Sequence, residues 1–526
     1  MTGLPPLFDA TKYIGPGFPE RPDFPTSADL LAHLDRLGVD RAVVWHTEAR
    51  SAHPMAGNER LLQEIAAAGA HDRLVPSFAV APSMIEDRGV MDRFLDLAKA
   101  HNVRAFRVWP RESGWTLWDI APIITALLPL KPALFLDVWQ DVRQEEMLSF
   151  AAEFPQASII ITDPMWVHYP MLYEMMEARP NVYAETALMH TYRTIEYLIH
   201  RFGAERVIFG AGYKSNNGAA IASLAHAEVS PEHADMIAHG NLERLLGIDP
   251  RPSAPRAIVG DRLWHRLLRR ERLGLDIIDA HAHLPRTTSG WDHRTDFDAH
   301  VRDTLCNMDG IGVRTMIVAG MEVAQLDSLE GNTYLEEHMR PYGDRFRGYF
   351  AFNPEYAEKL LPRLDEFFSR PFYVGFKLLN DYWRIPVTDS RFAPMWEYAD
   401  ARRLPVLLHT WQGQYNAPRM LREIAPRYPD ASFLLGHSGA SDRPDAEALV
   451  QENPNVYLEW CGSFTHPADW RETLERVGSR RLIFGTDGMG HDPAWELGRL
   501  LSLEMLDETF LPILGDNMRG ILGRRK

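Results

Sequence analysis

The second half of the chain places imidazole and carboxylate side chains at the ends of short apolar runs. One run, DIIDAHAH, ends with His281 and His283, two positions apart, and later runs end near His409, His437 and Asp487. Side chains alternate along a strand, so His281 and His283 are expected to point to the same face. Imidazole and carboxylate groups that converge at one place form a site for a divalent metal. Zinc is the first expectation, with Mn, Fe or Co as alternatives.

Eight apolar runs of strand character recur in each half, and stretches of helical periodicity, such as 397–403 and 421–427, separate most of them. Strands that alternate with helices predict a parallel sheet, and eight such units predict a closed barrel. The expected fold class is therefore α/β, with two tandem (β/α)8 TIM-like barrels. In such barrels the functional side chains gather at the C-terminal ends of the strands. The expected strands are 7–13, 41–47, 74–80, 103–109, 133–139, 158–164, 182–188 and 207–213, then 276–283, 315–320, 346–352, 373–379, 405–411, 432–438, 456–462 and 482–488.

An internal duplication explains why there should be two barrels. DRLVPSFAVAP (72–82) matches DRFRGYFAFNP (344–354), an offset of 344 − 72 = 272. NVYAE (181–185) matches NVYLE (455–459), an offset of 455 − 181 = 274. The order of the matching segments is kept and the offset drifts by only a few residues, as loop insertions would cause. We predict two domains, 1–250 and 251–526, each close to the roughly 250 residues of one such barrel.

The segment that joins the halves, 249–274, opens with prolines and continues as a basic, helix-like stretch. Leu263, Trp264, Leu267 and Leu268 lie on one face of that helix. We therefore expect it to pack on the second barrel rather than to lie on a membrane surface.

Composition and charge narrow the class of protein. A content of 45% apolar and 24% charged residues is typical of a globular protein. The formal net charge of −16 argues against a nucleic acid or an anionic membrane as partner. Two distant cysteines, Cys306 and Cys461, exclude a disulfide framework and favour a reducing compartment. We expect no secretory signal, since the first residues lack a basic stretch followed by an apolar one. We expect a cytoplasmic protein with a small-molecule substrate. The sequence leaves open whether the protein forms a homo-oligomer.

Five motifs of the second half resemble the amidohydrolase superfamily, in its branch of amidohydrolase-related (amidohydrolase 2) TIM-barrel metal-dependent hydrolases and decarboxylases. The motifs are DAHAH (279–283), GFKLL (375–379), LLHTW (407–411), LLGHSG (434–439) and IFGTDG (483–488), and the resemblance covers about 276–523. It implies that His281, His283, His409 and Asp487 bind the metal. His437 is then the expected acid/base and orienting residue, or a ligand of a second metal.

The residues around these motifs have open roles. Lys377 ends the fourth strand, where some members of the superfamily carry a carboxylated lysine that bridges two metals. The alternative is an ordinary cation that binds a substrate carboxylate. Asn353, Arg384 and Trp411 follow strands and are expected to line the substrate pocket, with Arg384 able to hold a carboxylate. Three further histidines in loops, His293, His466 and His491, are expected at the surface.

The expected activity follows from this ligand set. A metal with an open position activates water and polarises a carbonyl. Asp487 could accept the proton of that water, and His437 could pass a proton to the leaving group. We expect a metal-dependent hydrolase of a small carboxylated ester, lactone or amide. The alternative is a metal-dependent non-oxidative decarboxylase of an unsaturated or aromatic acid, and a non-catalytic scaffold is the remaining rival.

The first half has lost this chemistry at every matching position. In duplicate order, His281, His283, Lys377, His409, His437 and Asp487 become Thr11, Tyr13, Arg107, Asp137, Asp163 and Gly212. The first barrel is therefore expected to be a degenerate copy that does not hold this metal, although two aspartates remain for a hard cation. Its role could be to cover the active mouth, to contribute a loop, or to replace a partner subunit.

Overall fold

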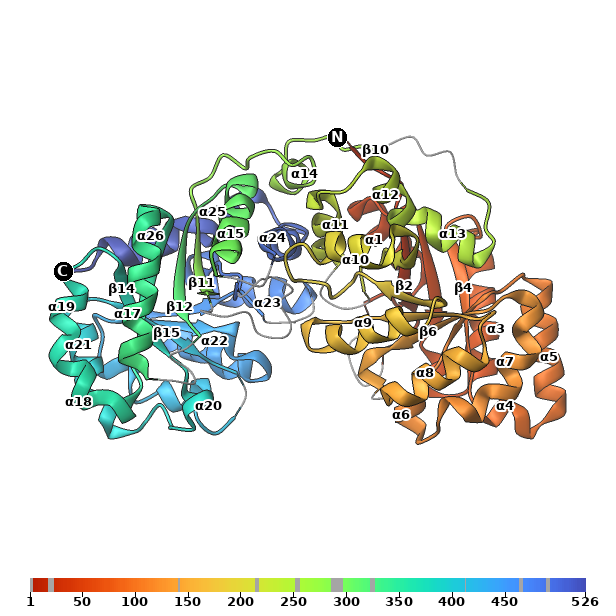
Figure 1. Cartoon of the computed structure of the whole chain (residues 1–526), viewed down its shortest axis with the longest axis horizontal. Coiled ribbons are helices and arrows are strands. Elements are labelled where there is room, and N and C mark those ends of the chain that lie inside the picture. The colour runs from red at the N-terminus through yellow and green to blue at the C-terminus, as the bar shows by residue number, and fades with distance from the viewer. Residues whose placement is uncertain are drawn as a thin grey trace. The chain divides into compact units, whose positions relative to one another are not determined.

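The computed structural model of the chain describes residues 3–17, 23–140, 142–212, 217–250, 256–284, 297–321, 327–411, 413–462, 467–488 and 492–526. The chain divides into two compact units, Met1–Gly260 and Asp261–Lys526. Each unit contains one eight-stranded sheet whose strands pair in chain order, and every pair in both sheets is parallel. Figure 1 shows strands with helices packed around them in each unit.

Each strand begins within two residues of the run expected from the sequence, but several strands end earlier, and the last strand of each unit ends five residues before its run does (213 − 208 and 488 − 483). Those of the first unit are β2 (Phe8–Ile14), β3 (Arg41–His46), β4 (Leu74–Ala79), β5 (Ala105–Arg107), β6 (Ala133–Asp137), β7 (Ser158–Thr162), β8 (Val182–Glu185) and β9 (Val207–Ile208). Those of the second unit are β11 (Ile277–Leu284), β12 (Val313–Gly320), β13 (Phe346–Ala351), β14 (Tyr373–Leu378), β15 (Pro405–His409), β16 (Ser432–Gly436), β17 (Val456–Glu459) and β18 (Leu482–Ile483).

Backbone hydrogen bonds join the first and last segments of each sheet. The amide of Ala10 donates to the carbonyl of Phe209 over 3.1 Å, and the amide of Ala280 donates to that of Phe484 over 3.0 Å. The two sheets are thus barrels, and the prediction of two tandem (β/α)8 barrels is confirmed.

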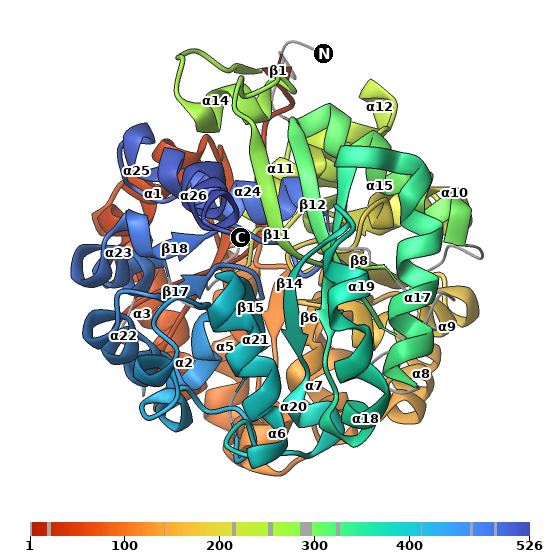
Figure 2. The ribbon, with the colours of Figure 1, turned by 90° about the vertical axis from the view of Figure 1, so that its left-hand side faces the viewer.

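Helices cover the outside of each barrel, as Figure 2 shows for the second unit. The longer helices of the first unit are α1 (Ser27–Leu37), α3 (Pro54–Ala67), α5 (Arg88–Ala100), α7 (Ala121–Leu127), α8 (Gln144–Glu153), α9 (Tyr169–Ala178), α10 (Thr194–Phe202), α11 (Asn217–His226) and α13 (Asn241–Leu246). Those of the second unit are α15 (Phe297–Ile311), α17 (Ser328–Met339), α21 (Ala393–Arg402), α22 (Arg443–Glu452), α23 (Pro467–Val477), α24 (Pro493–Leu501) and α26 (Asn517–Gly523).

One expected helix is wrong. The stretch 421–427 forms parts of two short 3-10 turns, Pro418–Leu421 and Ala425–Arg427, instead of an α-helix. Pro426 stands inside the stretch and has no backbone N–H to donate, which interrupts a helical ladder there. The other stretch, 397–403, lies almost wholly within α21.

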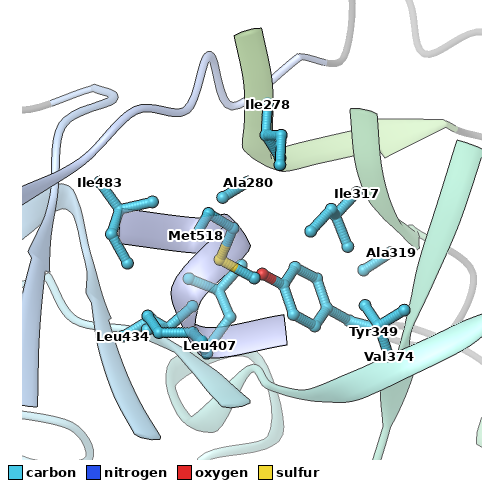
Figure 3. Close-up of a cluster of buried hydrophobic side chains, with 11 residues drawn as sticks. Ile278, Ala280, Ile317, Ala319, Tyr349, Val374, Leu407, Leu434, Ile483 and Met518 are labelled. Atoms are coloured by element: carbon cyan, nitrogen blue, oxygen red, sulfur yellow. The ribbon is translucent and has the colours of Figure 1, made fainter. Parts of the chain in front are cut away.

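A layer of apolar side chains fills the interior of each barrel. In the second barrel Ile278, Ile317, Leu407 and Ile483 come from four strands and pack with Met518 of α26 (Figure 3). In the first barrel a matching cluster includes Phe8, Val43, Phe135 and Ile208 with Leu242 of α13. Apolar alternation in the strands is therefore sufficient to build both cores, whatever stands at the strand ends.

Buried asparagines repeat the same contacts in both barrels. The side-chain amide of Asn181 donates to the carbonyls of Ala151, Phe154 and Ala157. That of Asn455, 274 positions later (455 − 181), donates to the carbonyls of Ala425, Tyr428 and Ala431. Asn58 and Asn332 likewise each bond both the amide and the carbonyl of one residue on the next strand. The duplication thus extends to individual hydrogen bonds.

The segment between the units contains a short strand and a short helix. β10 (Arg256–Ala257) pairs antiparallel with β1 (Gly3–Leu4). The helix α14 (Leu263–Leu268) buries Leu263, Trp264, Leu267 and Leu268 and packs against α24 of the second unit. Its predicted apolar face is confirmed. Among the described residues, no helix has both the length and the apolar character to cross a bilayer.

The paired asparagines provide a test of the duplicated construction. Asn455→Ala removes the donor for three carbonyls, and we expect the free energy of opening in the second barrel to fall by about 1–3 kcal/mol. Hydrogen exchange followed peptide by peptide would measure this loss. Asn181→Ala is the mirror control, which should weaken the first barrel and leave the second unchanged. Equal protection in all three proteins would contradict this account of the asparagines.

Candidate metal centre

Two imidazoles from β11 converge on one carboxylate after β18. A register shift between Asp279 and Ala282 in the pairing of β11 with β12 includes His281 and precedes His283, and such bulges re-aim side chains. His281 Nε2 and His283 Nε2 each lie 3.4 Å from Oδ1 of Asp487. The predicted common face of the two histidines is thus observed, and the carboxylate stands opposite both.

The other ring nitrogen of each histidine is engaged away from this carboxylate. His281 Nδ1 lies 2.9 Å from Oε2 of Glu459, and His283 Nδ1 lies 3.3 Å from the carbonyl oxygen of Ala319. Because Nδ1 donates in both cases, Nε2 of each ring keeps its lone pair. Burial lowers the pKa of both imidazoles, and the Lys377 ammonium lowers that of His281 further. Neutral, oriented imidazoles are the form that binds metals.

The donor set fits a small divalent ion. Zinc bonds to nitrogen and oxygen of about 2.1 Å give a tetrahedron whose edges are about 3.4 Å. The two Nε2–Oδ1 separations of 3.4 Å match that edge, and ligand atoms of His281, His283 and Asp487 all lie within 4.8 Å of one another. Lys377 Nζ lies 2.6 Å from Nε2 of His281, so the lysine occupies the lone pair that a bound ion would use.

A second group of potential ligands, His281, His437, Glu459 and Cys461, lies behind the first. His437 Nδ1 lies 3.1 Å from the carbonyl oxygen of Cys461, so it carries the proton and donates. Glu459 accepts the backbone amides of His437 and Cys461. Burial and the nearby Glu459 raise the pKa of the Cys461 thiol well above its usual range. This group is therefore a hydrogen-bonded support for His281 and His437 and not a thiolate metal site.

The ring of His437 lies beside two other imidazoles at the mouth of the barrel. The ring centroids of His281 and His437 are 5.0 Å apart, and those of His437 and His409 are 4.9 Å apart. His409 thus reaches the cluster through His437 and does not join the three-residue group around Asp487. Its Nδ1 lies 3.2 Å from Oδ2 of Asp381. Burial lowers the pKa of His437 to about 3, so that ring is neutral.

The residues expected to bind substrate occupy different environments. Lys377 is fully buried, and burial lowers the pKa of its ammonium to about 8. The Trp411 ring lies 5.1 Å from that of His437. Asn353 is buried and caps a 3-10 turn by accepting the amide of Glu355, and Arg384 is exposed in a left-handed turn. His293, His466 and His491 lie outside the described residues.

Asp487 is held in a backbone conformation that L-residues rarely adopt. Its φ is +57°, and its amide donates to the carbonyl of His281 over 2.7 Å. Burial by itself would raise the pKa of its carboxyl, but positive charge on the facing imidazoles of His437, His281 and His283 outweighs burial and holds that pKa well below its usual range. With those rings neutral, a bound cation would have to supply this charge. An ionised carboxylate at this point can ligate a cation or accept a proton.

The first barrel shows which parts of this arrangement belong to the barrel itself. Glu185, the counterpart of Glu459 (459 − 185 = 274), accepts the amides of Asp163 and Ala187 as Glu459 accepts those of His437 and Cys461. The left-handed turn at His437 recurs at Asp163, with φ of +61° and +53°. The glutamate and the turn are thus kept where the imidazoles are absent.

The mouth of the first barrel is filled by larger side chains. Pairing of the first two strands aligns Tyr13 with Trp45 in one barrel and His283 with Ala319 in the other. The Trp45 ring lies 5.6 Å from that of Tyr13 and 4.8 Å from that of Trp109. An aromatic cluster thus replaces the histidine and the alanine of the second mouth.

Asp163 remains at the mouth of the first barrel as a buried acid. Burial and the neighbouring Asp137 raise its pKa to about 7, while Arg107 opposes the shift. Arg107 donates to the carbonyl of Ala10 and to Oγ1 of Thr11, as Lys377 contacts His281. Arginine thus takes the lysine's place across the mouth of this barrel.

Sequence reasoning missed Glu459 and Asp381, the carboxylates behind His281 and His409. The repeated NVYAE and NVYLE segments contained the signal for Glu459, since a glutamate ends the seventh strand in both copies. Asp381 follows the fourth strand in a four-residue helix, and its spacing from His409 has no pattern in the sequence.

Comparison with known proteins agrees with the two-barrel division. The amidohydrolase family model matches residues 14–248 and 278–523. The chain therefore belongs to the amidohydrolase family, through both of its halves.

Individual relatives are distant. A segment of 119 residues is 29% identical to the protein fluG of Emericella nidulans, which covers 20% of this chain and 14% of that protein. A solved TIM-barrel protein of Bordetella bronchiseptica has 17% identity over 48% of this chain and 99% of its own, with a TM-score of 0.39. The 5-carboxyvanillate decarboxylase of Sphingomonas paucimobilis has 14% identity over 48% of this chain and 100% of its own, with a TM-score of 0.38.

The buried acid of the first barrel leads to a prediction about pH. A carboxyl whose pKa rises from 3.8 to about 7 on folding binds a proton in the folded state that the unfolded state has lost, so stability falls as pH rises from about 4 to 7. Asp163→Asn should therefore stabilise the first barrel at pH 8, by at most roughly 4 kcal/mol, and the gain should vanish near pH 4. Urea denaturation across this pH range would measure it.

The exposed Asp96 of α5 supplies the control. Asp96→Asn should follow the wild-type pH profile. A parallel shift of the Asp163→Asn curve at every pH would contradict a buried acid.

Proposed function

We propose that the protein is a metal-dependent hydrolase whose active site is the mouth of the second barrel. The convergence of His281 Nε2 and His283 Nε2 on Oδ1 of Asp487, at 3.4 Å each, carries this proposal. His281, His283 and Asp487, which the structure brings together, would hold the ion. His409, whose ring lies 4.9 Å from that of His437, would have to approach them to be the fourth ligand. Zinc is the first expectation, with Mn, Fe or Co as alternatives.

A metal bound in this place would activate water and polarise a carbonyl group. The ionised Asp487 can accept the proton that such a water loses. His437 is neutral and its Nδ1 proton is held by the carbonyl of Cys461. Its Nε2 therefore has a lone pair, which can accept a proton and then pass that proton to the leaving group. The neutral Cys461 thiol supports the ring and is not a nucleophile.

Lys377 supports a substrate that carries a carboxylate. Its ammonium is fully buried near His281 and Asp487, and a buried cation gains most from an anionic partner. Trp411 could supply an apolar wall beside His437. We therefore propose a small carboxylated ester, lactone or amide as the substrate class, with Lys377 unmodified.

Non-oxidative decarboxylation is the alternative for the same site, because a carboxylate beside a metal and a proton donor suits that reaction as well. Hydrolysis places an oxygen atom from water in the product, whereas decarboxylation releases carbon dioxide without net consumption of water. The two reactions therefore differ in their products on one substrate.

We further propose that the first barrel is a degenerate copy without this metal. Thr11, Tyr13, Asp137 and Gly212 replace the ligands, and the aromatic cluster around Trp45 takes up the space. Two free cysteines, one of them buried, support a reducing compartment such as the cytoplasm.

The first experiment joins metal content to product analysis. Purified protein should contain about one divalent ion per chain at the second barrel, and His281→Ala should lose both the ion and the activity. Thr11→Ala is the matched control in the first barrel and should keep both. Across a panel of carboxylated esters, lactones and amides in ¹⁸O-water, we expect one ¹⁸O atom in the acid product. Release of carbon dioxide, with no ¹⁸O in the remaining organic product, would establish the decarboxylase instead.

The role of Lys377 has its own test. Lys377→Met keeps most of the side-chain volume and removes the charge, so KM for a carboxylated substrate should rise by roughly 10–100-fold, the loss expected for one charged hydrogen bond. Metal content should stay at the wild-type level. A wild-type mass increased by one carboxyl group, or loss of metal in the variant, would favour the bridging carboxylated lysine.

A further inference from the structure

His409 is held from behind by a carboxylate on a neighbouring segment. Asp381 belongs to the short helix α20 (Asn380–Trp383), which follows β14, and its Oδ2 lies 3.2 Å from Nδ1 of His409. The exposed fractions of the two side chains are 27% and 16%, so the contact is mostly shielded from water. A carboxylate here requires the proton on Nδ1 and leaves the lone pair on Nε2.

Asn416 fixes the carboxylate in turn. Its side-chain amide donates to Oδ2 of Asp381 over 2.7 Å and to the carbonyl of His409. Both amide hydrogens are used in these two bonds, so the nearby Nδ1 of His409, at 3.4 Å, does not receive one. Nδ1 of His409 therefore donates to Asp381. Asn416 is itself buried, so its side chain is held in place while it bonds Asp381.

The first barrel shows that the fold does not require the contact between Asp381 and His409. The helix α6 (Pro110–Ser113) follows β5 as α20 follows β14, and both helices end at a left-handed residue, Gly114 and Arg384. With the offset of this region, 381 − 111 = 270, Asp381 corresponds to Arg111, which donates to the carbonyl of Trp139. The fold thus builds this turn without an aspartate.

The two carboxylates that support the histidines, Glu459 and Asp381, differ in whether the first barrel keeps them. Glu459 is kept as Glu185 although His281 has become Thr11, so its backbone contacts alone can account for it. Asp381 is absent from the barrel in which His409 has become Asp137. Because the aspartate occurs only in the barrel that has the histidine, its role concerns the histidine and not the fold.

We propose that Asp381 is a positioning residue that sets the tautomer and orientation of His409 for metal binding, with Asn416 holding it in place. This inference rests on the proposed function, since it concerns the same ion. Carboxylates behind ligating histidines contribute about 10–100-fold to metal affinity. Asp381 would act through its contact with His409 and not as a ligand itself.

The test measures metal affinity on the full chain. Co²⁺ would be titrated into metal-free protein, with a chelator competing, and its visible absorption recorded. Asp381→Ala should weaken binding by about 10–100-fold and change the Co²⁺ spectrum. Asp381→Asn should recover part of the affinity, since its amide oxygen can still accept from Nδ1. Arg111→Ala, the matched variant of the first barrel, should bind as the wild type does.

The outcomes separate the two proposals. Wild-type affinity in Asp381→Ala would overturn the positioning role and leave the metal site intact. A lowered melting temperature of metal-free Asp381→Ala, with an unchanged Co²⁺ spectrum, would make Asp381 a structural residue and also overturn it. A wild-type protein that binds no Co²⁺ would overturn the proposed function together with this inference.

Discussion

The candidate centre depends on the seam where the second barrel closes. The carbonyl of His281 accepts the amides of Thr486 and Asp487, and the amide of His283 donates to the carbonyl of Gly488. These bonds fix the first strand against the segment after the eighth, two parts of the chain about two hundred residues apart. The imidazoles and the carboxylate therefore meet because the barrel closes there, and their separation is set by backbone hydrogen bonds and not by flexible side chains.

The duplicated barrel distinguishes what the fold requires from what the chemistry requires. Asp9 and Asp279 each accept the amide two residues on and an amide near the eighth strand. In the second barrel the remaining oxygen of Asp279 accepts the hydroxyl of Thr486, whereas in the first that of Asp9 pairs with Lys12. The aspartate is thus an element of closure with interchangeable partners. The imidazoles, in contrast, are replaced in the first mouth by Thr11, Tyr13, Asp137 and Asp163, so the fold does not require them.

The sequence predicted the barrels well because their signals are local and repeated. Apolar runs define strands, and two copies of each run confirm one another. The ends of the strands also placed His281, His283 and Asp487 at one mouth. The sequence could not predict the supporting contacts, because Asp381 and His409 lie on different segments that meet only in the folded chain. The prediction of a helix over 421–427 was wrong because the helical periodicity of this stretch was given more weight than the proline within it.

Backbone strain offers a further physical reason to regard Asp487 as functional. The position requires a positive φ in both barrels, +57° at Asp487 and +69° at Gly212. Glycine adopts this conformation without cost, whereas an aspartate there costs of order 1 kcal/mol or more. The first barrel has the relaxed residue and no imidazoles to face it. The second keeps the strained carboxylate at the one point where two Nε2 lone pairs converge, and a cation bound by all three groups is what would offset that cost.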